Sequence, residues 1–448
     1  MIVLKFGGTS VRDASWMTRA LEICEQQLDR APLVVSSAMG KTTDTLIDLG
    51  RRANRGTDYA NTFDDLVLAH RTAVRTLAPG AQTDLDALLR DLAALLEGVR
   101  RIRELSARTV DALLSFGERM ATEIWYRAAI ARGYDAVLLD SRKLLRTDSH
   151  FGNANLQSDT TGDLIRAGVT PQPGRLYIAQ GFIASDDTGA TTTLGRGGSD
   201  YTASIYGSAL GAEQIQIWTD VDGIMSADPR LVPAARTVPE VGYAEAAELA
   251  YFGGTVIHPA TILPAVHNRI PIVVGNTADP NRARTVIHDQ PQGGRIRALT
   301  GRTGVTLISV RSSRMLNAYG YLSRIFATFE QHRISVDLLA TSEVSVTVSI
   351  DDSNPSEAFI DDLSRHGAVE VTRHQAVISL IGARVWRDPA LIARVFTTVK
   401  AVDRSPEVRM VSLGSSDTNL SLVVEADTFE TVVRALHTEL FDFEGGAV

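Results

Sequence analysis

The stretch IVLKFGG at residues 2–8 opens the chain with a short apolar strand that ends at two consecutive glycines. From 15 to 29 apolar side chains recur at helical spacing, and the apolar run LVV at 33–35 follows directly after Pro32. A strand, a helix and a second strand within about thirty residues are typical of a βαβ unit, whose strands are parallel. The N-terminal sequence therefore predicts an α/β fold.

The alternation of helices and strands continues beyond this unit. Amphipathic helices are expected through 43–131, and a Thr-rich, hairpin-like segment at 188–194 precedes a helix over 199–210. Further buried strands are expected at Ala136–Leu139, Leu176–Ala179, Ile215–Trp218 and Ile272–Val274. Strands that alternate with helices predict a mainly parallel sheet covered by helices on both faces.

Length and composition exclude several classes of protein. The chain has 448 residues, enough for about three domains, and its 45 basic against 53 acidic residues give a net charge of −8. An acidic balance argues against a nucleic-acid partner, and no apolar run approaches the ~18 residues that span a membrane. The N-terminus lacks the long apolar segment of a signal peptide, and the single Cys24 excludes internal disulfides. We therefore expect a cytoplasmic protein without nucleic-acid or membrane partners.

The composition changes near 289–304, where Gln, Gly and Pro cluster, and an internal repeat follows. Each copy approximates the pattern β-α-β-β-α-β of a ferredoxin-like split βαβ sandwich. In the first copy we expect strands at 307–310, 335–340, 344–350 and 369–371 and helices at 321–331 and 357–365. In the second copy we expect strands at 376–381, 408–413 and 420–425 and helices at 389–399 and 429–441.

Three domains are therefore expected, at 1–293, 294–373 and 374–448. Two tandem copies without an obvious catalytic cluster are interpreted as sensor modules. Modules that only mediate dimerisation are the alternative, because a fold alone does not determine a function.

The motif KFGGTS at 5–10 lies at the end of the first strand, where α/β sheets bind their ligands. Two glycines let backbone N–H groups approach an anion closely, and Lys5 adds a positive charge. The motif indicates phosphate binding, with a tight turn beside a solvated lysine as the alternative. The later segment MGKTT at 39–43 is not a P-loop, because Val35 stands where that motif requires glycine. Its hydroxyls either bind a ligand or only cap a helix.

The motif FGER at 116–119 lies within a predicted helix, where Gly117 costs about 1 kcal/mol relative to alanine and indicates close packing. Glu118 either accepts a substrate ammonium group or is a surface carboxylate paired with Arg119. These two interpretations stay open from the residues alone.

The motif GRGGSD at 195–200 surrounds one arginine with three glycines and continues into a helix N-terminus, which favours anions. Arg196 offers a planar fork that suits a carboxylate, and Asp200 could orient a lysine. A solvated glycine loop is the alternative. TDVDG at 219–223 and DPR at 228–230 suit the ribose and phosphates of a nucleotide, but Asp-Gly and Asp-Pro are also common in turns.

In this order, the segments resemble those of the aspartate kinases, which have the amino-acid kinase fold. The matching segments are KFGGTSV at 5–11, FGER at 116–119, TTTLGRGGSDYTA at 191–203, WTDVDGIMSADPR at 218–230 and FGGTVIHPAT at 252–261. SVDLLATSEVSV at 335–346 is similar to the effector-binding stretch of the monofunctional, lysine-sensitive members. The resemblance implies that ATP, with Mg²⁺, phosphorylates the side chain of L-aspartate to 4-phospho-L-aspartate. This reaction is the first step towards lysine, threonine and methionine.

The resemblance further implies that the two repeats are ACT domains, partly interleaved in sequence. They would bind lysine as a feedback inhibitor and join the chains into a homodimer or a dimer of dimers.

The resemblance also assigns roles to single residues. Lys5 would neutralise the transferring phosphoryl group, and Asp200 would hold Lys5 in place. Aspartate would be bound by Ser37, Thr43, Glu118 and Arg196. ATP would be bound by Gly7, Gly8, Thr219, Asp220 and Arg230. Lysine would be bound by Met315, Tyr321, Leu322, Ser335, Val336, Asp337, Thr341, Ser342 and Glu343. No protein side chain is assigned to a metal.

Two positions depart from the pattern of the family. Thr255 stands where relatives usually carry a phosphate-contacting lysine, and Ala318 stands where lysine-sensitive relatives often have serine. A kinase of another acid, such as glutamate, acetylglutamate or carbamate, is disfavoured by the FGER insert and the tail. A non-catalytic amino-acid sensor is opposed by Lys5, Arg196 and Asp200.

Overall fold

The computed structural model describes residues 1–251, 259–292, 296–316, 318–352, 355–403, 406–413 and 417–442. They form two compact units. The first comprises Met1–Ile224, Pro239–Tyr243 and Thr255–Pro291, and the second comprises Met225–Val238, Ala244–Gly254 and Gln292–Val448. The second unit thus includes two stretches that precede residue 293, where the sequence places the end of the first domain.

The first unit contains an eight-stranded sheet of order β3-β4-β2-β1-β7-β9-β10-β8. Its strands are β1 (Ile2–Phe6), β2 (Pro32–Ser36), β3 (Asp135–Leu138), β4 (Arg175–Gln180), β7 (Gln214–Thr219), β8 (Glu240–Gly242), β9 (Ile272–Asn276) and β10 (Thr285–His288). The six strands from β3 to β9 in this order are parallel, and only β10 runs antiparallel to β9. The predicted mainly parallel sheet is confirmed, whereas β8 and β10 at its edge are not predicted by the sequence patterns.

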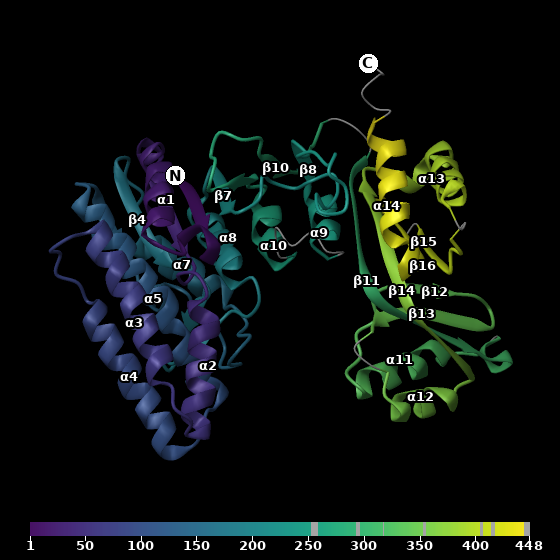
Figure 1. Cartoon of the computed structure of the whole chain (residues 1–448), viewed down its shortest axis with the longest axis horizontal. Helices are drawn as coiled ribbons and strands as arrows, with labels where there is room; N and C mark the ends of the chain where they lie inside the picture. The colour runs from purple at the N-terminus through teal and green to yellow at the C-terminus, as the bar shows by residue number, and fades with distance from the viewer. Residues whose placement is uncertain are drawn as a thin grey trace. The chain divides into compact units, whose positions relative to one another are not determined.

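Helices cover both faces of this sheet (Figure 1). On one face α1 (Ala14–Glu25) and α5 (Ala107–Ala131) pack against the side chains of β1, where the rings of Phe6 and Trp125 lie 5.3 Å apart. On the other face α8 (Gly198–Leu210) packs on β1 and β7. Gly207 makes this contact close, because a Cβ there would lie 2.8 Å from the side chain of Ile215.

The remaining helices of the first unit extend α5 into a bundle and border the sheet. They are α2 (Thr42–Arg55), α3 (Ala60–Leu77), α4 (Leu85–Ile102), α6 (Ser141–Leu144), α7 (Ser158–Gly168) and α10 (Pro259–Asn268). A leucine-rich core joins α2, α4 and α5. The predicted hairpin is formed by β5 (Ile183–Ser185) and β6 (Thr191–Thr193). Within the described residues, no helix is long and apolar enough to cross a membrane.

The second unit contains a six-stranded antiparallel sheet of order β12-β13-β11-β14-β16-β15. Its strands are β11 (Ile296–Arg311), β12 (Leu339–Thr341), β13 (Ser345–Asp351), β14 (Ala368–Gly382), β15 (Met410–Leu413) and β16 (Asn419–Glu425). The long strands β11 and β14 pair along their whole lengths, from Ile296 with Gly382 to Arg311 with Ala368 (Figure 1). Each therefore serves both repeats.

Three predicted strands of the tail are corrected by the structure. The separate strands expected at 369–371 and 376–381 are one strand, β14, because the irregularity at His374, with φ +56°, bends the strand without ending it. The strand expected at 335–340 is reduced to β12. Its first part is irregular, since Ser349 bonds the backbone of both Asp337 and Leu338.

Four helices cover this sheet in pairs. The first pair, α11 (Tyr321–Gln331) and α12 (Glu357–Ser364), packs around Phe329 and Phe359, whose rings are 5.0 Å apart. The second pair, α13 (Pro389–Ala401) and α14 (Phe429–His437), covers the other half, as Figure 1 shows. A further helix, α9 (Tyr243–Tyr251), bonds to the sheet region through Glu245 with Arg297 and Glu248 with Asn419.

Candidate active site and effector site

A cavity of about 340 Å³ lies in the first unit where β1 and β2 end and α8 begins. This is the carboxyl edge of a parallel sheet, where such folds bind ligands. Its lining comprises Lys5, Gly8, Ser37, Ala38, Gly40, Thr43, Glu118, Phe182, Gly195, Gly197, Gly198, Ser199 and Asp200. The structure therefore brings together both predicted catalytic residues and three of the four residues predicted to bind aspartate.

Lys5 and Asp200 form an ion pair across this cavity, with 2.5 Å between Nζ and Oδ1. Lys5 lies near the end of β1, and Asp200 lies in the first turn of α8. Both side chains are largely buried but retain 11 and 13 % exposure, so that the pair is reachable from the cavity. A Cβ at Gly7 would lie 3.3 Å from Nζ, so this glycine leaves room for the ammonium group.

Hydroxyl groups connect the two sides of the cavity. Ser37, after β2, and Ser199, at the start of α8, bond through their Oγ atoms at 2.9 Å. Thr43 also lines the cavity, whereas Thr42 donates its hydroxyl to the carbonyl of Met39 at 2.6 Å. Ser199 is missed by the sequence reasoning. Its position beside Asp200 in GRGGSD is the signal that could have found it.

Glu118 is a buried carboxyl group rather than a surface one, and its side chain does not pair with Arg119. Its Oε1 accepts a hydrogen bond from the backbone N–H of Ala38 at 3.1 Å, while its buried Oε2 has no partner. Burial raises the pKa of Glu118 to about 8. Arg119 instead lies over the ring of Phe116. A buried oxygen without a partner at the cavity wall suits a substrate ammonium group.

The close packing expected at Gly117 is also present. A Cβ at Gly117 would lie 2.8 Å from the Cβ of Ala38, so only glycine lets α5 approach the loop after β2 this closely. The glycine thus allows the bond between Glu118 and Ala38 to form.

Other predicted site residues do not line this cavity. Arg196 is exposed, although its neighbours Gly195 and Gly197 do line it. Thr219 donates a hydrogen bond to Asp220 at the end of β7. Arg230 belongs to the second unit, where it is exposed and paired with Asp228 at 2.6 Å. Thr255 lies outside the described residues.

A second cavity of about 470 Å³ lies in the second unit beside the start of α11. Its lining includes five predicted effector residues, Met315, Tyr321, Leu322, Ser342 and Glu343, together with Leu316, Ala318, Tyr319 and Gly320. The predicted residues that do not line it are Ser335, Val336, Asp337 and Thr341.

Asp337 already has partners within the second unit. Its carboxylate pairs with Arg302 and accepts a hydrogen bond of 2.8 Å from the phenol of Tyr251. Arg302 also pairs with Asp351.

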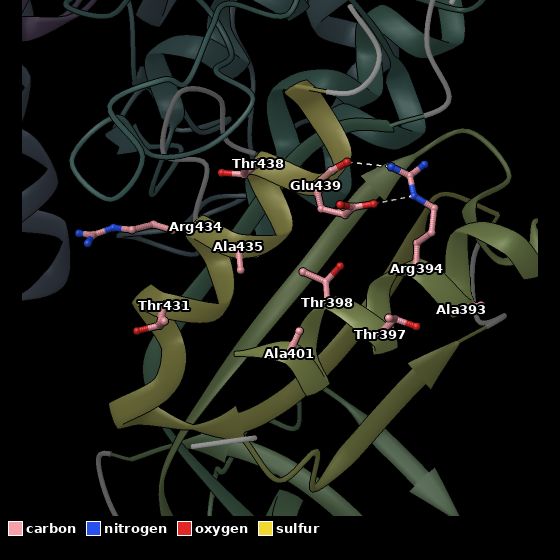
Figure 2. A pocket seen from close by; sticks show the side chains of 10 residues that line it. All are labelled: Ala393, Arg394, Thr397, Thr398, Ala401, Thr431, Arg434, Ala435, Thr438 and Glu439. Atoms are coloured by element: carbon pink, nitrogen blue, oxygen red, sulfur yellow. Dashed lines mark hydrogen bonds and ion pairs between the residues drawn. The ribbon is translucent and has the colours of Figure 1, made fainter. Parts of the chain in front are cut away.

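A third cavity, of about 720 Å³, is a groove between α13 and α14 (Figure 2). Its walls are mainly alanine and threonine side chains. Arg394 is paired with Glu439 at 3.0 Å, and Arg434 points away from the groove and donates to the carbonyl of Leu231. The charged side chains that line this groove therefore already have partners, and this distinguishes the groove from the cavity that contains Glu343.

Comparison with known proteins agrees with both units. The model of the amino acid kinase family matches residues 1–276, and that of an ACT domain matches residues 378–440. Fold and site thus define an amino acid kinase with an ACT tail. Lysine-sensitive aspartokinase 3 of Escherichia coli is 35 % identical over 453 residues, which cover 99 % of each chain. The chloroplastic aspartokinase 2 of Arabidopsis thaliana is 34 % identical, with 98 % of this chain and 84 % of that protein covered.

Solved structures agree with these relatives. E. coli aspartokinase III in complex with aspartate and ADP has a TM-score of 0.83 and 36 % identity, covering 98 % of this chain and all of that one. The same enzyme in complex with lysine and aspartate has a TM-score of 0.81. The chain therefore belongs to the aspartokinases, and the resemblance inferred from its motifs is confirmed.

Proposed function

We propose that the chain transfers the γ-phosphoryl group of Mg²⁺-bound ATP to the side-chain carboxylate of L-aspartate, which gives 4-phospho-L-aspartate. The observation that carries the proposal is the cavity at the end of β1. There Lys5, Asp200 and Glu118 line the same space, with Lys5 and Asp200 joined in an ion pair and the buried Oε2 of Glu118 without a partner. The E. coli relative, whose structure contains aspartate and ADP, supports the choice of substrates.

The chemistry requires positive charge because both reacting groups are anions. Two like charges 4 Å apart repel by about 1 kcal/mol in water and about 4 kcal/mol at an effective dielectric constant of 20. Lys5, the backbone N–H groups at the start of α8 and the Mg²⁺ on ATP would offset this repulsion. Asp200 fixes the direction of the Lys5 ammonium group. The nucleophile is already a carboxylate, so no general base is needed.

Aspartate would be oriented by groups on both sides of the cavity. Glu118 would bind its ammonium group, and Ser37 and Thr43 would donate hydroxyl hydrogen bonds. Arg196 is assigned to the α-carboxylate from a loop whose flanking glycines line the cavity. Gly7, Gly8, Thr219 and Asp220, which all belong to the first unit, keep their proposed role towards ATP.

One assay separates this function from its rivals. Purified chain is incubated with MgATP and one acid at a time, and acyl phosphate is trapped with hydroxylamine. Aspartate should react, and glutamate, acetylglutamate and carbamate should not. Lys5→Ala and Arg196→Ala should lower turnover strongly. A chain that forms no acyl phosphate with aspartate would instead be a sensor or a kinase of another acid.

We also propose that lysine binds in the second unit and favours a less active state. Glu343 at the second cavity offers negative charge to an amino acid with two ammonium groups. The E. coli relative, whose structure contains lysine and aspartate, supports this effector. A homodimer or dimer of dimers through the ACT domains remains part of the proposal, and light scattering of the full chain tests it.

A further inference from the structure

A second buried carboxylate lies on the same helix as Glu118. Asp111 precedes Glu118 on α5 by about two helical turns, so the two side chains project from similar faces of the helix. The side chain of Asp111 is fully buried. Its Oδ2 accepts from the backbone N–H groups of Gly152 and Thr193, and its Oδ1 accepts from the hydroxyl of Thr193, all at 2.9 Å.

Burial of a carboxylate is costly unless hydrogen bonds offset the loss of water. Burial raises the pKa of Asp111, and the donors from Gly152 and Thr193 oppose that rise. These donors are neutral groups, so the carboxylate of Asp111 binds the backbone of Gly152 and Thr193 rather than a cation.

Both segments lead directly to the glycine loop of the cavity. Thr193 ends β6, two residues before Gly195. Asn153 follows Gly152, and its Oδ1 would lie 2.2 Å from a Cβ at Gly195, so this amide packs directly on the glycine. Ala154 donates its N–H to the carbonyl of Thr193 at 2.9 Å, which joins the two segments.

One rigid helix thus supports both walls of the cavity. Through Glu118 it bonds Ala38 in the loop after β2. Through Asp111 it bonds β6, which continues into the wall formed by Gly195 and Gly197. Both walls are therefore bonded to the same helix.

We propose that Asp111 is a positioning residue that holds the Gly195–Gly197 loop at the aspartate side of the cavity. The proposal rests on the proposed function, because it assigns this wall to aspartate rather than to ATP. Asp111 touches no reacting atom and acts only through Thr193, Gly152 and the loop that follows.

The test compares Asp111→Ala with Asp111→Asn in the full chain. The alanine removes three hydrogen bonds, and the expected result is a rise of at least about tenfold in the KM for aspartate. The KM for ATP should change less than about threefold. The asparagine should restore most of the loss, because its amide oxygen accepts from both N–H groups and its NH₂ donates to the threonine hydroxyl.

Asp186 provides a matched control. It is also buried, and most of its hydrogen bonds come from the turn between β5 and β6: the backbone N–H groups of Thr188 and Ala190 and the hydroxyl of Thr188. One further bond comes from the hydroxyl of Ser149. Asp186→Ala should therefore lower the melting temperature without a selective rise in the KM for aspartate. An equal rise for Asp186→Ala and Asp111→Ala, or equal rises in both KM values, would reduce Asp111 to a structural residue and overturn the proposal.

A second readout does not depend on turnover. Backbone amides at 193–198 should exchange hydrogen faster in Asp111→Ala than in the wild type, while those of α4 should not change. Unchanged exchange at 193–198 would overturn the proposal even if activity fell. If Asp111→Ala does not fold, Thr193→Val removes only the hydroxyl donor and should give a smaller change of the same kind. A wild type without aspartate kinase activity would contradict the proposed function but leave the exchange result interpretable.

Discussion

The ammonium group of Lys5 lies 2.5 Å from the carboxylate of Asp200, so a strand end and a helix start meet through one ion pair. Asp200→Asn would leave the lysine in place but remove the charge that directs it. We expect kcat to fall by about 10²- to 10³-fold, the range found when one stabilising group of a transition state is removed. Steady-state kinetics measures this change in kcat. Asp163→Asn is the control, because Asp163 forms an exposed ion pair with Arg166, and its kcat should stay within about twofold of the wild type. An Asp200→Asn enzyme with wild-type turnover would contradict the role of this pair.

Glu118 should make aspartate binding dependent on pH. Because burial raises its pKa to about 8, the group is mostly protonated at neutral pH and must ionise to bind an ammonium group. The KM for aspartate should therefore fall as pH rises towards 8, by up to about tenfold per pH unit. Glu118→Gln should raise the KM roughly 10- to 100-fold at pH 8 and abolish this dependence. A glutamine variant with the wild-type pH profile would exclude Glu118 as the source.

The same group should affect folding stability. Its pKa is higher in the folded chain than the ordinary value of 4.5, so the folded state binds the proton more tightly than the unfolded state. The contribution is fully present below about pH 4.5 and is lost as pH rises to about 8, by at most about 1.4 kcal/mol per pH unit. Urea unfolding at pH 6 and pH 8 should show Glu118→Gln gaining stability relative to the wild type at the higher pH. A constant difference between the two proteins would refute the assignment.

Gly117 and Gly98 form a contrasting pair of helical glycines. A Cβ at Gly117 would collide with Ala38, whereas a Cβ at Gly98 on α4 would meet nothing within 4 Å. Gly117→Ala should destabilise the chain by about 1–3 kcal/mol and raise the KM for aspartate, because it displaces the loop that Glu118 holds. Gly98→Ala should stabilise the chain by up to about 1 kcal/mol and leave kinetics unchanged. Melting curves and steady-state kinetics of both variants test this prediction. Equal changes in stability and in the KM for aspartate would mean that the packing at Gly117 is unimportant.

Glu343 should determine the response to lysine. It is exposed at the second cavity, where neutralisation removes charge without disturbing a core. Glu343→Gln should raise the half-inhibitory lysine concentration by about tenfold or more and leave the activity without lysine unchanged. Asp361→Asn, at an exposed position of α12 outside the cavity, is the control. Equal inhibition of all three proteins would place the effector elsewhere.

Local sequence signals were sufficient for the catalytic fold. The strand that contains Lys5 and the helix that contains Asp200 are marked by apolar periodicity and glycines, so their type and approximate bounds could be predicted. The environment of Glu118 could not be predicted from the sequence. Its burial depends on the fit of Gly117 against Ala38, a contact between residues almost eighty positions apart.

The tail shows the same limit. The helix at 321–331 has its predicted bounds, because its apolar face is a local signal. The partners of Asp337 were not predicted, because Tyr251 and Arg302 reach it from distant segments. The continuity of β14 through His374 could not be predicted either, because the four polar residues at 372–375 separate its two apolar runs in the sequence.

The shared strands β11 and β14 limit how this tail can be exchanged between proteins. A chimera cut at residue 373 would divide β14, and the half of β11 at 296–303 would be left without its partner at 376–382. Exposed strand edges of this kind invite aggregation. Transplanting a new effector response onto this enzyme therefore requires the whole stretch from 292 to the end of α14 as one graft, or point substitutions within a single pocket.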